Sequence, residues 1–126
     1  IVYGVFVSLG FAWAENVIYV THPILGGYET AFARALLSVP GHGLFGVRMG
    51  YYFALGKYRS RKRYLPLAFF SPYLAHALYN YFLLKREPVF WLFFSVLEAR
   101  LWVFGLKRIK ELQNCSPFRE KVSKES

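Results

Sequence analysis

Cysteine is almost absent from this chain, and so are the marks of a secreted or soluble protein. The one cysteine among 126 residues, Cys115, excludes a disulfide within the chain and a metal cluster built from cysteine ligands. The first residues lack the basic flank and small-residue cleavage site of a signal peptide, and no polar segment is long enough for a separate soluble domain. Because the chain begins without methionine inside an apolar run, we expect a fragment of a longer protein.

Hydrophobic segments dominate instead, with 56% hydrophobic and 21% aromatic residues and a mean hydropathy of +0.27. A spanning helix needs about 20 mostly apolar residues. Four stretches approach that length: residues 1–20, 30–55, 65–84 and 89–106. Their apolar runs are continuous, without the alternation of barrel strands. We predict an all-α fold, a polytopic transmembrane bundle of about four helices over residues 1–113, with a kink at Val39-Pro40-Gly41.

The net charge of +9 follows the predicted topology. Five of the seven residues from 57 to 63 are basic, and Lys107, Arg108 and Lys110 follow the last span. Since basic residues concentrate on the cytoplasmic side, we place this loop and the polar tail, residues 114–126, in the cytoplasm. The charge is thus explained without a nucleic-acid partner, and for residues 59–63 we consider contact with anionic lipid as a secondary role beside the topology signal.

Polar residues inside the predicted spans are costly, at about 2.5–3.5 kcal/mol for each ionisable group. At the helical rise per residue, Glu15 lies roughly 8 Å below the outer end of its span, His76 roughly 12 Å, and His42 roughly 10–18 Å. The three side chains can therefore meet in the outer half of the bilayer. A carboxylate with two histidines can bind a divalent metal with an open position, or the glutamate can activate water directly. Both routes lead to hydrolysis.

Structural roles are the alternative for each of these groups. Glu15 can pair with Arg34 to stabilise helix packing, and a histidine in a bundle is often only a hydrogen-bonding group. Arg34 can equally grip a substrate carbonyl or reach the interface. We expect Arg48 and Glu98 to pair across the bundle, and Arg100 to reach the headgroups.

Three motifs together resemble the PrsW-type intramembrane proteases, distant relatives of the CAAX prenyl proteases and the bacteriocin-immunity membrane proteins. They are Gly10-Phe-Ala-Trp-Ala-Glu-Asn16 followed by Tyr19, Arg34-Ala-Leu-Leu-Ser-Val-Pro-Gly-His42, and His76-Ala-Leu-Tyr-Asn80. The resemblance implies a peptidase of the bacterial cytoplasmic membrane that cleaves a membrane-anchored protein, such as an anti-sigma factor, near the extracytoplasmic side.

The resemblance also implies roles for matching residues. Glu15, His42 and His76 would be catalytic and would hold a divalent metal such as Zn²⁺, and three further residues would support them: Asn16, Asn80 and Arg34. The family's pair of adjacent glutamates has no counterpart, because no two acidic residues are adjacent. Either the pair precedes Ile1 in a longer protein, which leaves this site incomplete, or it is lost, which makes the chain a pseudoenzyme. The alternative function is a non-catalytic scaffold, transporter or immunity-type protein.

Overall fold

The computed structural model describes residues 1–24, 26–85 and 87–114, and every regular element within these ranges is an α-helix. The helices are α1 (Val2–Thr21), α2 (Tyr28–Leu36), α3 (Ser38–Tyr58), α4 (Arg61–Leu84) and α5 (Pro88–Asn114). The predicted all-α fold is confirmed. From residue 115 onward, the predicted polar tail lies outside the described residues.

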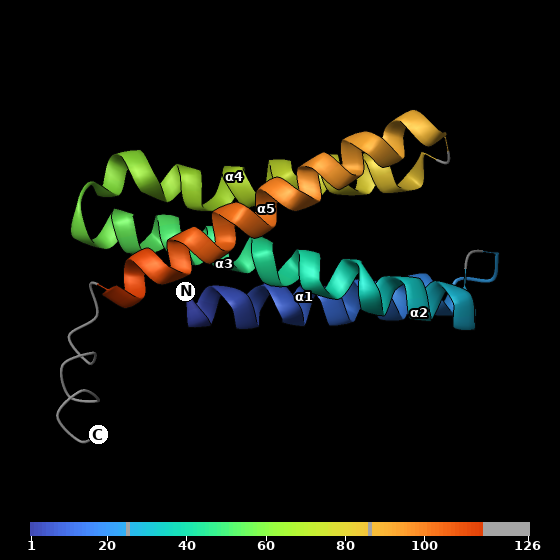
Figure 1. Cartoon of the computed structure of the whole chain (residues 1–126). Coiled ribbons are helices and arrows are strands. Elements are labelled where there is room, and N and C mark those ends of the chain that lie inside the picture. The colour runs from blue at the N-terminus through green and yellow to red at the C-terminus, as the bar shows by residue number, and fades with distance from the viewer. Residues whose placement is uncertain (25, 86, 115–126) are drawn as a thin grey trace, which may run out of the picture.

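Helix α3 occupies the centre of the bundle and contacts each of the other four helices. The long helices α1, α3, α4 and α5 alternate in direction, so the α3–α4 connection and the C-terminal end of α5 lie at the same end (Figure 1). The C-terminal ends of α1 and α4 lie at the opposite end. This arrangement brings the two basic segments of the sequence, the loop around residues 57–63 and the end of α5, to one end of the molecule.

The second predicted span is divided into α2 and α3 at Leu37, slightly before the expected kink. Pro40 explains the position, because its ring collides with the carbonyl of the residue four earlier, Leu36, and it has no N–H to donate there. Leu37 marks the break, with φ −107° and ψ −54°. The hydroxyl of Tyr79 on α4 donates a hydrogen bond to the Leu37 carbonyl at 2.6 Å, so α4 stabilises the break from across the bundle.

Two of the described helices, α1 and α5, are long and apolar enough to cross a membrane by length and composition. Only 11% of the apolar window of α1 and 17% of that of α5 are buried within the protein. Large hydrophobic side chains point outward instead, among them Phe6, Trp13 and Ile18 on α1. Helices α3 and α4 are also long but carry the polar residues of the candidate site, including His42 and His76, which lowers their hydropathy.

Glycine permits a very close approach between α1 and α3. A β-carbon on Gly46 would lie 2.6 Å from the Cα of Val5, and one on Gly4 would lie 2.6 Å from the Gly46 carbonyl oxygen. Small residues allow such backbone packing between helices in membranes. The Ser8 hydroxyl adds a 2.6 Å hydrogen bond to the carbonyl of His42, which fixes α1 against the segment of α3 that carries the site.

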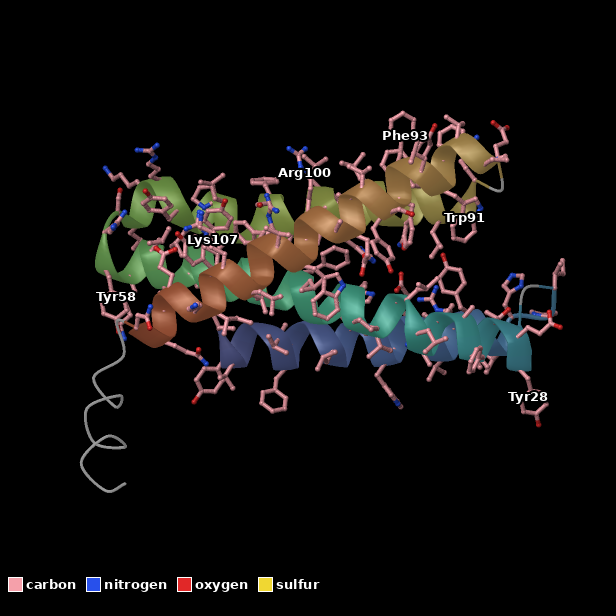
Figure 2. The ribbon with its side chains drawn as sticks, in the orientation of Figure 1. Tyr28, Tyr58, Trp91, Phe93, Arg100 and Lys107 are labelled. Carbon is pink, nitrogen blue, oxygen red and sulfur yellow. The ribbon has the colours of Figure 1, made fainter. Side chains whose placement is uncertain are left out.

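The expected pairing of Arg48 with Glu98 is wrong. Arg48 donates through Nε to the Ser71 hydroxyl on α4. The Glu98 carboxylate instead accepts a 3.0 Å hydrogen bond from the indole of Trp102, four residues later on the same face of α5. Each side chain thus finds a nearer partner, and Arg100 points away from the bundle (Figure 2).

Candidate active site

Three helices bring the predicted catalytic residues together. Glu15 comes from the last third of α1, His42 from the second turn of α3, and His76 from the second half of α4. The Nε2 atom of His42 lies 3.0 Å from Oε2 of Glu15, and Nε2 of His76 lies 3.6 Å from Oε1. One ligand atom from each residue lies within 4.8 Å of the other two. The convergence expected from helix depth is therefore present.

Arg34 on α2 anchors the carboxylate. Its Nη2 lies 2.8 Å from Oε2 of Glu15 and 3.1 Å from the Ser38 hydroxyl, and its Nε donates to the side-chain oxygen of Asn16 at 2.6 Å. The guanidinium also lies 4.0 Å from the ring centroid of Tyr19. The planar donor fork of arginine suits this set of acceptors. The Glu15–Arg34 pair considered as a structural alternative is therefore formed, within the same cluster as the histidines.

The two oxygens of Glu15 have different surroundings. Oε2 makes the shorter contacts, with Arg34 and His42. Oε1 faces His76 at 3.6 Å and the amide nitrogen of Asn80 at 3.4 Å. The Asn80 amide also lies 3.2 Å from Nε2 of His76, four residues earlier on α4. Oε1 is thus the oxygen held less tightly.

Aromatic rings surround the histidine pair. The imidazoles of His42 and His76 lie 4.8 Å apart between centroids, and both contact Phe45 from the core and Phe11 from α1. His42 is only 3% exposed, and the side chain of Glu15 is 13% exposed. These rings restrict water around the polar atoms, which strengthens the electrostatic interactions within the cluster.

The donor set fits a divalent transition metal. Two ligands at about 2.0–2.2 Å from a tetrahedral ion lie roughly 3.3–3.6 Å apart. The nitrogen–oxygen separations of 3.0 Å from His42 and 3.6 Å from His76 are to different oxygens of Glu15, and a set with one ligand atom from each residue lies within 4.8 Å, so these side chains would close in slightly around an ion. Two imidazoles and a carboxylate are a known catalytic zinc set that leaves one position open. Glu15, His42 and His76 are therefore the residues that could hold an ion.

Three residues that support the candidate site were not assigned a role from the sequence. Ser38 accepts from Arg34, Ser8 fixes α1 to α3, and Tyr79 supports the helix break. Ser38 could have been found, because it lies four residues after Arg34 and four before His42 and so shares their helix face. Ser8 and Tyr79 act across helices, and their spacing carries no such signal.

Comparisons with known proteins agree on one family. The family described as PrsW family intramembrane metalloprotease matches residues 1–104. Protease PrsW of Geobacillus kaustophilus is 41% identical over 88% of this chain and 48% of its own length. Those of Oceanobacillus iheyensis and Bacillus subtilis are 43% and 38% identical over 87% and 90% of this chain, and 50% and 52% of their own. The chain therefore spans about half the length of these curated relatives. No solved structure matches it.

Proposed function

The chain belongs to the PrsW family of intramembrane metalloproteases, and on this premise we propose that Glu15, His42 and His76 form the catalytic centre of a membrane-embedded peptidase. The observation that carries the proposal is their convergence from three helices, with ligand atoms within 4.8 Å of one another. A carboxylate and two imidazoles held so closely can activate a water molecule toward a peptide carbonyl.

The arrangement of hydrogen bonds suggests how these residues divide the work. Arg34 and His42 hold Oε2 of Glu15, which leaves Oε1 to accept a proton from the attacking water. The Asn80 amide lies beside Oε1 and His76 and can donate to the oxyanion that forms on the carbonyl. In this scheme His42 orients the carboxylate, and Arg34 keeps it ionised by charge pairing.

A divalent metal, Zn²⁺ being the best match to the donor set, would polarise the carbonyl and lower the pKa of a bound water. Glu15, His42 and His76 would be its ligands. Direct donation from Nε2 of His42 to Glu15 needs a proton on that nitrogen, whereas metal ligation through the same nitrogen needs its lone pair. The metal and the His42–Glu15 hydrogen bond therefore exclude each other, so metal analysis separates the two schemes.

The substrate we propose is a membrane-anchored protein, such as an anti-sigma factor, cleaved near the extracytoplasmic side. Glu15, His42 and His76 lie in the halves of their helices remote from the basic loop at residues 57–63. If that loop is cytoplasmic, the site faces the outer half of the bilayer. A transmembrane or juxtamembrane segment would then present its peptide bond at the right depth.

The direct test compares cleavage of a membrane-anchored reporter by the complete protein and its variants. Glu15→Gln and His76→Ala should each lower the cleavage rate by at least ~10²-fold, as expected for loss of a general base or its partner. His22→Ala, in the connection after α1, is the matched control and should cleave normally. Wild-type cleavage by both site variants would refute the proposed centre.

Metal content is measured on the same proteins by mass spectrometry. If the metal scheme holds, purified wild-type protein retains close to one divalent ion per chain and loses activity to a chelator, and His42→Ala retains far less. Full cleavage by metal-free, chelator-treated protein would instead favour direct activation of water by Glu15.

One observation favours the alternative, a non-catalytic membrane scaffold or transporter. Arg34 binds Glu15, Asn16 and Ser38 together, which is how a purely structural ion pair would be satisfied. In that case Glu15→Gln would reduce the stability of the bundle. The complete protein would then show no His76-dependent cleavage of any membrane-anchored reporter.

A further inference from the structure

A large groove lies at the end of the bundle remote from the candidate active site. It has a volume of about 1190 Å³ and runs between α1, α3 and the start of α4. Its walls are mainly apolar, with Val7 from α1, Met49, Phe53 and Ala54 from α3, and Leu65 from α4. The groove is larger than the ~300–1,000 Å³ of ordinary small-molecule sites, and a mainly apolar lining suits long hydrocarbon chains.

Three cations stand at one end of this groove: Lys57, Arg59 and Arg61. All three are exposed, and no acidic residue lines the groove. None of the three takes part in an ion pair within the described residues, whereas Arg108 at the same end is paired with Glu111. The groove therefore joins an apolar channel to uncompensated positive charge.

Tyrosine and lysine side chains at this end are placed as in an interfacial region. Figure 2 shows Tyr58 at the end where α3 meets α4, with Lys107 on the part of α5 that runs toward the same end. The Lys57 ammonium lies 5.6 Å from the ring centroid of Tyr58. Aromatic and basic residues together are typical of the boundary between hydrocarbon and headgroups. This boundary is where the phosphate of a lipid would meet the three cations.

We propose that the groove is a binding site for one anionic phospholipid, with the headgroup phosphate on Lys57, Arg59 and Arg61 and the acyl chains along Met49, Phe53 and other apolar side chains. The charge complementarity selects an anionic headgroup, and the apolar walls select a lipid over free phosphate. The site requires only that the bundle is embedded in a membrane. The outcome of a lipid-binding test is therefore independent of whether Glu15 takes part in hydrolysis.

Binding is tested on the purified protein in neutral detergent by native mass spectrometry. Titration with phosphatidylglycerol should saturate at one tightly bound lipid, while phosphatidylcholine and glycerol phosphate should bind much more weakly. The triple variant Lys57→Gln, Arg59→Gln, Arg61→Gln should lose roughly a hundredfold in phosphatidylglycerol affinity, about fivefold for each charge. Equal affinity for the two phospholipids would overturn the proposal.

A matched variant separates a site from general attraction to positive charge. Arg100→Gln, Lys107→Gln, Lys110→Gln removes the same number of charges from α5, outside the groove, and should change the affinity by less than about fivefold. An equal loss in both triple variants would mean nonspecific electrostatics and would refute the site. Ala54→Trp fills the channel without changing charge and should also weaken binding; unchanged affinity would exclude the acyl channel.

The occupant in the cell is identified with a photoreactive amino acid in place of Phe53, which lines the groove and is 52% exposed. Irradiation of bacterial membranes containing the complete protein should give an adduct with the mass of a phospholipid. Crosslinking to polypeptide, whether another segment of the same protein or a partner, would show that protein covers this face and would overturn the proposal.

Discussion

The ion pair between Arg34 and Glu15 offers the sharpest test of how this site is held together. The pair is separated by 2.8 Å, with side chains only 10% and 13% exposed. Breaking a buried pair by removing one partner costs about 3–5 kcal/mol, because the remaining charge stays desolvated. We therefore expect Arg34→Gln to lower the free energy of unfolding by about 3 kcal/mol or more. Lost hydrogen bonds to Asn16 and Ser38 contribute to the same loss.

A double-mutant cycle isolates the pair from these other contacts. Glu15→Gln leaves the Arg34 guanidinium without its charge partner and should also destabilise the bundle. The double variant, with two neutral amides, should lose less than the sum of the single variants by about 1–3 kcal/mol. Arg34→Lys keeps the charge but not the planar donor fork, so it should lie between wild type and Arg34→Gln.

Unfolding is followed by circular dichroism in mixed detergent micelles as the fraction of denaturing detergent rises. Arg100→Gln serves as the control, because that side chain is exposed and points away from the bundle, and should stay within about 0.5 kcal/mol of wild type. Single-variant losses that add to within about 0.5 kcal/mol in the double variant would refute the view that the pair anchors the site.

Two further predictions concern the helices that position the site. Tyr79→Phe removes the 2.6 Å hydrogen bond to the Leu37 carbonyl, which keeps its bond from the Gly41 N–H, and should cost about 0.5–1.5 kcal/mol in the same unfolding assay, whereas Tyr73→Phe, at an exposed position, should be neutral. Gly46→Ala places a methyl group against the α1 backbone at 2.6 Å and should destabilise by about 1–3 kcal/mol; Gly43→Ala, with open space around it, should be neutral or stabilising, and equal effects would contradict the close α1–α3 contact.

The helical nature of the fold could be predicted because it rests on local patterns. Long continuous apolar runs indicate helices wherever hydrocarbon surrounds the chain, and the span predicted to begin at residue 89 corresponds to α5, which begins at Pro88. The position of the break in the second predicted span could be predicted less precisely from the sequence. Pro40 indicated a break nearby, but the break lies at Leu37 because Pro40 acts on the preceding turn and Tyr79 adds a hydrogen bond to the Leu37 carbonyl from another helix.

The candidate site was visible in the sequence because polar groups are rare in apolar segments. Glu15, His42 and His76 stand out in such surroundings, and helix depth placed them at similar levels. Arg48 and Glu98 stood out equally, yet their expected pairing was wrong. Depth gives the height of a side chain along its helix but not its direction around the helix, so the pairing of polar groups could not be read from position alone.

The amino-acid sequence by itself thus determined which segments are helical, in which order they run, and which few polar side chains need a partner, because these depend on local hydrophobicity and spacing. The tertiary structure decided the partners. Glycine contacts set the approach of α1 to α3, and the break at Leu37 brings Arg34 to the oxygen of Glu15 that also faces His42. Such contacts depend on the rotation and separation of whole helices, which no local pattern encodes.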